Sequence, residues 1–189
     1  MVLVALTGRP GVGKSTVFMR VVQELGSLGY RVYGFYCPEV REHGRRIGFR
    51  IVDIRSGVSG WLALELSKAQ QMGYGSSGRR VGKYVVIESE AERIGVAALS
   101  KPPMEGSVLG IDEVGPMELS IARLRLEIIR ALEYAVRGIV VIHRNLSDVE
   151  VAGVLRRRGF DVVNVTEANR DNLHREIIRK FIQSRDAVN

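Results

Sequence analysis

The chain has 189 residues, of which 46% are hydrophobic and 26% charged, so it can bury a core without disulfide staples. Its one cysteine, Cys37, excludes an internal disulfide, and the lack of any run of eighteen apolar residues argues against a membrane-spanning helix, so we expect a cytoplasmic protein without membrane contact. The net charge of +7 favours polyanionic partners, but the basic residues fall in separate groups without interleaved aromatic residues, which leaves nucleic acid open as a partner without favouring it.

Apolar runs of strand length alternate with segments of helical period, which predicts an α/β fold with a mostly parallel central sheet flanked by helices. The apolar first residues lack a basic leader and run into Gly8, so we interpret them as a buried strand rather than a signal peptide. Strands are expected at residues 2–7, 30–35, 49–54, 84–88, 108–112, 139–143 and 161–165. Helices are expected at residues 13–28, 89–99, 119–136, 147–158 and 169–183.

Three stretches interrupt this alternation. A turn rich in glycine and arginine precedes residues 49–54, which predicts a β-hairpin insertion. Residues 56–84 are rich in glycine and serine, and we interpret them as short strands with a mobile surface loop, not as a linker between domains. Two prolines predict a further loop at residues 101–106. We therefore expect residues 1–189 to form a single domain.

A glycine-rich motif follows the first expected strand and opens the first expected helix. It matches G-x-x-x-x-G-K-[ST] at each fixed position and reads Gly8-Arg9-Pro10-Gly11-Val12-Gly13-Lys14-Ser15. Glycines let the backbone wrap around an anion, and the backbone N–H groups at the helix start then face phosphate oxygens. Lys14 suits the β- and γ-phosphates, the Ser15 hydroxyl suits Mg²⁺, and Thr16 suits the α-phosphate. The motif predicts a nucleotide-binding P-loop.

A second motif is an apolar strand that ends in two acids, Val108-Leu109-Gly110-Ile111-Asp112-Glu113. In P-loop proteins an acid at the end of this strand holds Mg²⁺, which predicts a metal role for Asp112 beside Ser15. Adjacent side chains of a continuing strand point to opposite faces. We therefore expect the strand to end at Asp112, which would let Glu113 turn toward the γ-phosphate and polarise water.

Other polar groups leave their roles open. His143, Arg144 and Asn145 follow a strand, so they are expected at the same crevice, either as sensors of the γ-phosphate or as an ordinary polar loop. The segment does not form the guanine-reading N-K-x-D pattern. Arg41, Arg45 and Arg46 either reach phosphates or flank the hairpin. We interpret Cys37 as a small apolar residue without a chemical role.

Together these segments resemble a family of small P-loop nucleoside triphosphatases that includes the human cancer-related nucleoside triphosphatase and relatives from thermophiles. The resemblance covers nearly the whole chain. Besides the P-loop, its marks are Gly34-Phe35-Tyr36, Glu39-Val40-Arg41, Gly44-Arg45-Arg46-Ile47-Gly48-Phe49, Val81-Gly82-Lys83-Tyr84-Val85-Val86, Ile111-Asp112-Glu113-Val114-Gly115, Met117-Glu118-Leu119 and Val165-Thr166-Glu167-Ala168-Asn169-Arg170.

The resemblance implies a RecA-like P-loop fold and slow, base-tolerant hydrolysis of ATP, GTP, CTP and UTP. It implies that Glu113 activates water, that residues 108–115 belong to the nucleotide site, and that residues 166–170, with Asn169 and Arg170, lie near the base. The chain departs from the family at Cys37-Pro38, where Thr-Glu is usual, and at Pro116, where lysine is frequent.

The main prediction is thus a monomeric Mg²⁺-dependent enzyme that acts on nucleoside triphosphates, with Lys14 and Glu113 as the catalytic residues. Two alternatives stay open. One is a nucleotide or nucleoside kinase, with residues 73–80 as a lid over the phosphates. The other is a nucleotide-dependent switch module that associates with RNA.

Overall fold

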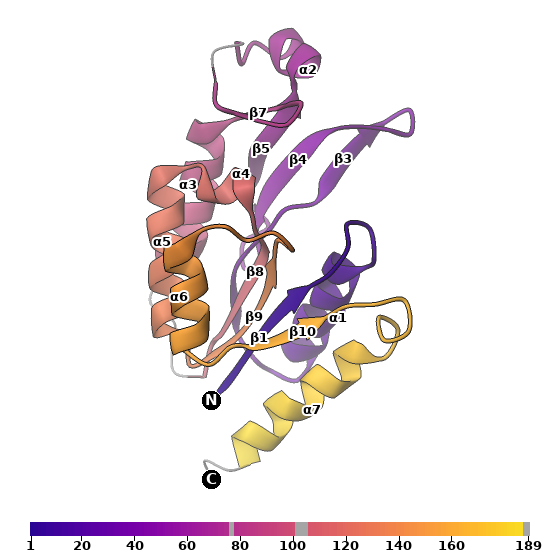
Figure 1. The fold of residues 1–189 in the computed structure, drawn as a ribbon, viewed down its shortest axis with the longest axis vertical. Coiled ribbons are helices and arrows are strands. Elements are labelled where there is room, and N and C mark those ends of the chain that lie inside the picture. Colours follow the sequence, from indigo (N-terminus) through magenta and orange to yellow (C-terminus); the bar gives the residue numbers. More distant parts are fainter. Residues whose placement is uncertain (76–77, 101–105, 187–189) are drawn as a thin grey trace.

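The computed structural model describes residues 1–75, 78–100 and 106–186. Within these residues the strands form one ten-stranded sheet in the order β10-β1-β9-β8-β2-β4-β5-β7-β6, with β3 paired to β4 (Figure 1). The first five strands of this order run parallel to one another. They are β1 (Val2–Thr7), β2 (Val32–Tyr36), β8 (Val108–Val114), β9 (Arg137–Ile142) and β10 (Asp161–Asn164).

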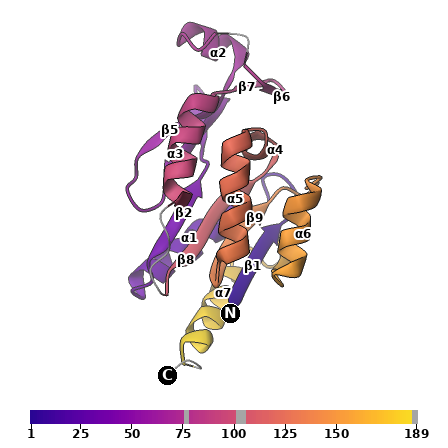
Figure 2. The same ribbon diagram turned by 90° about the vertical axis from the view of Figure 1, so that its left-hand side faces the viewer.

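The other five strands are antiparallel and belong to one segment, residues 39–86, which we call the insertion. They are β3 (Glu39–Glu42), β4 (Arg45–Asp53), β5 (Ser59–Glu65), β6 (Arg80–Val81) and β7 (Tyr84–Val86). The short helix α2 (Leu66–Gln71) lies at the far end of the insertion in both views (Figures 1 and 2). The predicted hairpin is confirmed as β3 and β4, which turn at His43 and Gly44, both with positive φ.

Helices cover both faces of the parallel strands and divide the core in two. On one face lie α1 (Lys14–Ser27) and α7 (Leu173–Asp186), which bury Phe18 and Phe181. On the other lie α3 (Glu88–Ser100), α5 (Ala122–Tyr134) and α6 (Val149–Arg157), side by side in Figure 2. The four-residue helix α4 (Pro116–Leu119) follows β8. No helix in the described ranges is long and apolar enough to cross a membrane.

The predicted α/β class, its parallel central strands and its flanking helices are confirmed. Residues 56–84 were predicted as short strands with a mobile surface loop. Strands β5 and β6 lie in this stretch, whereas the helix α2 was not predicted. Three helices begin two or more residues later than expected. The helix expected from residue 119 begins at Ala122, because Leu119 ends the separate helix α4. The Asp148 side chain accepts from the Val151 N–H and caps α6, and hydrogen-bonded turns occupy residues 166–172 before α7. Most of the loop expected at residues 101–106 lies outside the described residues.

Candidate active site

The P-loop connects β1 to α1 at the carboxyl end of the parallel strands, where such sheets place ligands. Gly8, Gly11 and Gly13 all have positive φ, a conformation that side chains disfavour. A β-carbon at position 8 would lie 2.6 Å from the backbone oxygen of Val165, so only glycine fits there. Gly13 precedes α1 without a side-chain cap, which leaves the backbone N–H groups of the first turn open to an anion.

Lys14 lies across this loop. Its Nζ donates to the backbone oxygens of Gly8 and Arg9, each at 3.3 Å. Burial raises the pKa of both Asp112 and Glu113, and the charge of Lys14 opposes this shift in both, so Lys14 acts on the acids at the end of β8. The P-loop lysine and the acid pair, more than ninety positions apart in the sequence, thus meet at one edge of the sheet.

Asp112 is buried, with 5% of its surface exposed, and its carboxylate accepts a hydrogen bond from the Ser15 hydroxyl. Burial raises the pKa of Asp112 to about 7, against the opposing effects of Ser15 and Lys14. A cation beside the carboxylate would favour its ionised form. The pairing of a hydroxyl with a buried carboxylate supplies two of the hard oxygen ligands that Mg²⁺ prefers.

The expectation that the strand ends at Asp112 was wrong, because β8 continues to Val114. The pairing of β8 with β9 shifts register between Asp112 and Val114, so the regular alternation of faces is interrupted at Glu113. Glu113 is half-buried, and burial raises its pKa while Lys14 and His143 lower it. The charge of Lys14 therefore acts on both carboxyl groups, although adjacent side chains in a regular strand would point to opposite faces.

A third acid, Glu118, lies beside the pair and was not predicted as a site residue. It lies in α4, just after β8, is 4% exposed, and burial raises its pKa to about 8. The Cys37 thiol donates a hydrogen bond to it, so the interpretation of Cys37 as merely apolar was incomplete. A β-carbon at Gly115 would lie 2.9 Å from Glu113 Oε1 and 3.2 Å from Glu118 Oε2. A lone acid between Met117 and Leu119 was the only signal in the sequence.

The segment before α7 lies against the P-loop from the other side. Arg170 Nη1 is 3.5 Å from the Val12 backbone oxygen. Asn169 instead binds its own loop, since its Oδ1 accepts from the Thr166 N–H and its Nδ2 donates to the Asn164 oxygen. A pocket of about 290 Å³ opens between the two segments and is lined by Gly11, Gly13, Thr16, Arg20, Arg170 and Asp171. Of the two predicted residues, Arg170 therefore reaches the pocket and Asn169 shapes the loop.

The loop after β9 lies beside Glu113. The His143 N–H donates to the Val114 oxygen at 3.1 Å, and His143 Nδ1 accepts from the Asn145 N–H at 3.2 Å. This loop borders a second pocket of about 300 Å³, together with Gly115 and Pro116. The expectation that residues 143–145 lie at the same crevice is consistent with this arrangement, whereas Arg144 is exposed and does not line the pocket.

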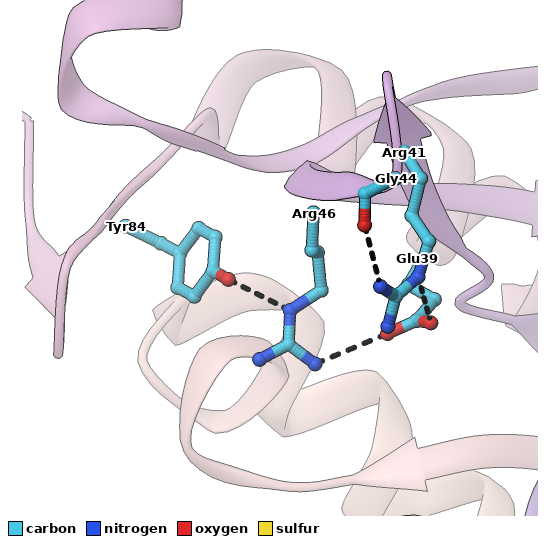
Figure 3. A network of polar contacts seen from close by, with 5 residues as sticks. All are labelled: Glu39, Arg41, Gly44, Arg46 and Tyr84. Atoms are coloured by element: carbon cyan, nitrogen blue, oxygen red, sulfur yellow. Dashed lines mark hydrogen bonds and ion pairs between the residues drawn. The ribbon is translucent and has the colours of Figure 1, made fainter.

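The three arginines of the hairpin bind partners within the insertion, and Figure 3 shows two of them, Arg41 and Arg46. Arg41 and Arg46 both pair with Glu39, and Arg46 also donates to the Tyr84 hydroxyl at 2.7 Å. Arg45 pairs with Glu65 at 2.6 Å. Of the two roles left open for these residues, the structure favours the one in the hairpin.

Comparison with known proteins agrees with this geometry. A model of the NTPase family matches residues 3–178. Nucleoside-triphosphatase THEP1 of Saccharolobus solfataricus is 40% identical over 97% of this chain and 94% of its own, and that of Hyperthermus butylicus is 41% identical over 96% and 91%. The solution structure of a human cancer-related nucleoside triphosphatase aligns with a TM-score of 0.76 at 31% identity, covering 97% of this chain and 98% of its own.

Proposed function

This chain belongs to the NTPase family, and from that premise we propose that it is an enzyme that hydrolyses nucleoside triphosphates to the diphosphate and phosphate. We further propose Mg²⁺ as its cofactor, slow turnover, and ATP, GTP, CTP and UTP as substrates. The observation that carries the proposal is the joint position of Lys14, the Ser15–Asp112 hydrogen bond and Glu113 at the strand ends. Few arrangements other than a triphosphate site explain this combination.

Lys14 and the P-loop bind and stabilise the phosphates in this proposal. We expect Lys14 to exchange its contacts with the Gly8 and Arg9 oxygens for the β- and γ-phosphate oxygens. The open N–H groups at the start of α1 supply further donors, and the Thr16 hydroxyl is proposed to bind the α-phosphate. These fixed donors stabilise the charge that shifts toward the leaving diphosphate during the reaction.

Ser15 and Asp112 are the residues that would hold Mg²⁺. Their oxygen atoms fit a hard cation, and the buried Asp112 carboxylate lacks a lysine or arginine ion pair among the described residues. When bound there, Mg²⁺ would offset negative charge on the phosphate oxygens.

Glu113 is proposed to orient the attacking water and to receive its proton. Its raised pKa brings the carboxylate closer to the range in which a general base works near neutral pH. Its interactions with Lys14 and His143 support a position between the P-loop and the end of β9. Because attack on phosphorus needs little base strength, orientation of the water contributes alongside proton transfer.

The experiment that tests the proposal is phosphate release from the four nucleotides with Mg²⁺, repeated with excess chelator. We expect hydrolysis that stops with the chelator and returns with Mg²⁺. Lys14→Ala should lower turnover by about 10²–10³-fold, because a preorganised cation is lost from the transition state. Lys180→Ala, which removes a surface lysine paired with Asp161, is the matched control and should keep the parent rate. Full activity in chelator, or in folded Lys14→Ala, would exclude this site.

A further inference from the structure

The second pocket, of about 300 Å³, lies beside the acid pair on the side formed by the loop after β9. Gly115, Pro116 and Leu119 form one wall, and the other comes from His143 and residues 145–148. Its volume is at the low end for small-molecule sites, so it suits a compact ligand. The P-loop pocket shares no lining residue with it, and Glu113, on which both Lys14 and His143 act, lies between the two.

The walls of this pocket offer hydrogen bonds from uncharged groups. Within the described residues, the Ser147 hydroxyl and the Asn145 side-chain amide make no hydrogen bond. His143 Nδ1 already accepts a bond, so Nε2 is the ring nitrogen that carries the proton in the neutral form. These groups can both donate to and accept from ligand hydroxyls. Leu119 and Leu146 add apolar surface.

The charges around the pocket select against an anion. Neither a lysine nor an arginine is among its lining residues in the described chain. Its one carboxylate, Asp148, is paired with Arg125 at 2.7 Å and caps α6, so that charge is already satisfied. A phosphate or carboxylate in this pocket would thus lack a strong cationic partner, whereas an uncharged compound would not need one.

Glu113 connects the pocket to the reaction. Gly115 is part of the pocket wall, and its missing β-carbon would lie 2.9 Å from Glu113 Oε1. His143 also lines the pocket and acts electrostatically on Glu113. Glu113 itself is not a lining residue, but two residues that line the pocket, Gly115 and His143, are its neighbours, so the pocket lies next to the carboxylate that is proposed to activate water.

We propose that this pocket binds a small uncharged hydroxyl compound, of the size of a sugar or nucleoside, as an acceptor of the γ-phosphoryl group. The inference rests on the proposed function, since it uses the same nucleotide and Glu113. The acceptor oxygen forms a bond to the γ-phosphorus, the bond from that phosphorus to the bridging β–γ oxygen breaks, and the nucleoside diphosphate leaves. Glu113 takes the proton of the acceptor hydroxyl.

The test is incubation of the whole chain with Mg²⁺ and ATP labelled at the γ-phosphate, in the presence of adenosine, uridine, ribose or glycerol. Adenosine monophosphate and uridine monophosphate serve as the anionic acceptors for comparison. The readout is the label in organic phosphate against the label in free phosphate. We expect a phosphorylated product from at least one uncharged acceptor and none from the monophosphates.

Ser147→Leu fills the pocket at an exposed position, so the chain should still fold, and the ratio of transfer to hydrolysis should fall by about tenfold or more. Ser67→Leu, the same change on α2, should leave that ratio unchanged. Hydrolysis with no transfer to any acceptor overturns the inference and leaves the proposed function standing. Transfer to the monophosphates alone, or an unchanged ratio in Ser147→Leu, also overturns it. Absence of both products refutes the proposed function itself.

Discussion

The two halves of the sheet use charged residues in opposite ways. Acids at the end of β8 and in the following helix α4 are buried or half-buried, and burial raises their pKa values: Asp112 to about 7, Glu118 to about 8, and Glu113 in the same direction. Acids of the insertion pair with arginines, and their pKa values are lowered: Glu39 by Arg41, and Glu65 by Arg45. A carboxyl group held against its preferred ionisation is typical of a functional site, whereas a paired one stabilises structure.

The insertion also concentrates the basic charge. Its residues 39–86 contain nine lysines and arginines against four acids, a net +5 of the chain's +7. All four cation–π contacts in the described chain lie there, as do five of its eleven ion pairs. The parallel strands β1, β8 and β9 are instead buried almost throughout and place polar groups at their ends. We infer that charged residues stabilise the structure in the insertion, and that they take part in chemistry at the ends of the parallel strands.

The largest expected effect is on the rate of hydrolysis in a variant of Glu113, and its absence would contradict this comparison. Glu113→Ala should lower single-turnover hydrolysis by about 10²–10⁴-fold while nucleotide affinity persists, because Glu113 acts only when water attacks. Glu113→Gln should retain part of the rate if orientation of the water dominates. Asp112→Asn should weaken both binding and rate, since Asp112 belongs to the proposed Mg²⁺ site.

Glu65→Ala makes the same change as Glu113→Ala in the insertion and serves as the matched control. It removes the partner of Arg45 and Lys83 and should leave turnover unchanged. If Glu113→Ala hydrolyses as fast as the parent, or if Glu65→Ala is the slower variant, then the direction of the pKa shift does not distinguish catalytic from structural carboxyl groups in this fold.

The sequence identified the P-loop better than the elements that surround it. The P-loop was predictable because glycine positions and the Lys14-Ser15 pair follow directly from phosphate geometry. The interruption of β8 at Glu113 was not, since pairing with β9 determines it. Glu118 and Cys37 come into contact because β2 pairs with β8, which places Tyr36 opposite Asp112. This pairing joins residues that are far apart in the sequence, so the contact could not be predicted from local signals.

The insertion was underestimated for a related reason. Glycine and serine in residues 56–84 indicated short strands around a loop, but β5 is seven residues long, because pairing with β4 and β7 stabilises it beyond its local propensity. The hairpin of β3 and β4 was predictable, because its turn contains Gly44 between two short alternating runs. Local signals thus defined the turns, and the width of the sheet came from contacts distant in sequence.

The next effect is the pH dependence of stability at Glu118. A carboxyl whose folded pKa is raised to about 8 stabilises the fold fully below its unfolded pKa, and this contribution is lost as the pH rises through the folded value. Glu118→Gln should therefore remove a slope of at most about 1.4 kcal/mol per pH unit between about pH 5 and about pH 8. The measurement is denaturant unfolding of parent and variant across that range.

Glu39→Gln is the counterpart from the insertion, with the opposite sign. Its folded pKa is lowered, so its contribution is present above the unfolded pKa and is lost as the pH falls through the folded value. Its difference from the parent should therefore grow toward neutral pH and vanish in acid. Equal slopes for Glu118→Gln and the parent would contradict the assignment of a buried, neutral Glu118.

A smaller effect is expected in the insertion itself. Arg46→Met removes the hydrogen bond to Tyr84 and the pair with Glu39 (Figure 3). It also removes the contact of the guanidinium with the Phe49 ring, 5.2 Å from the ring centroid. The free energy of unfolding should fall by about 1 kcal/mol, since the group is partly exposed. Turnover should not change. Arg41→Met, whose pair with Glu39 is more exposed, should cost less, and a loss of activity in Arg46→Met would move the insertion into the active site.

The smallest expected effect is the difference in rate between nucleotides with different bases, which bind at the parallel half of the sheet in the proposed function. The pocket beside the P-loop is lined by exposed side chains such as Arg20, Arg170 and Asp171, which present charge to solvent rather than a fixed set of donors and acceptors. Specific reading of a base requires buried polar groups that remain unpaired with the wrong ligand. We therefore expect rates on ATP and GTP to differ by less than about tenfold, or about 1.4 kcal/mol.

The comparison of kcat/KM for the two nucleotides checks this, and Arg170→Ala refines it. If Arg170 contacts the base through its planar guanidinium, its loss should raise KM for both nucleotides alike, because stacking tolerates any base. A hundredfold preference for one nucleotide would instead reveal a base-reading group, and unequal changes in Arg170→Ala would identify Arg170 as part of it. In that case the parallel half would recognise a whole nucleotide, whereas the geometry described above supports recognition of the triphosphate alone.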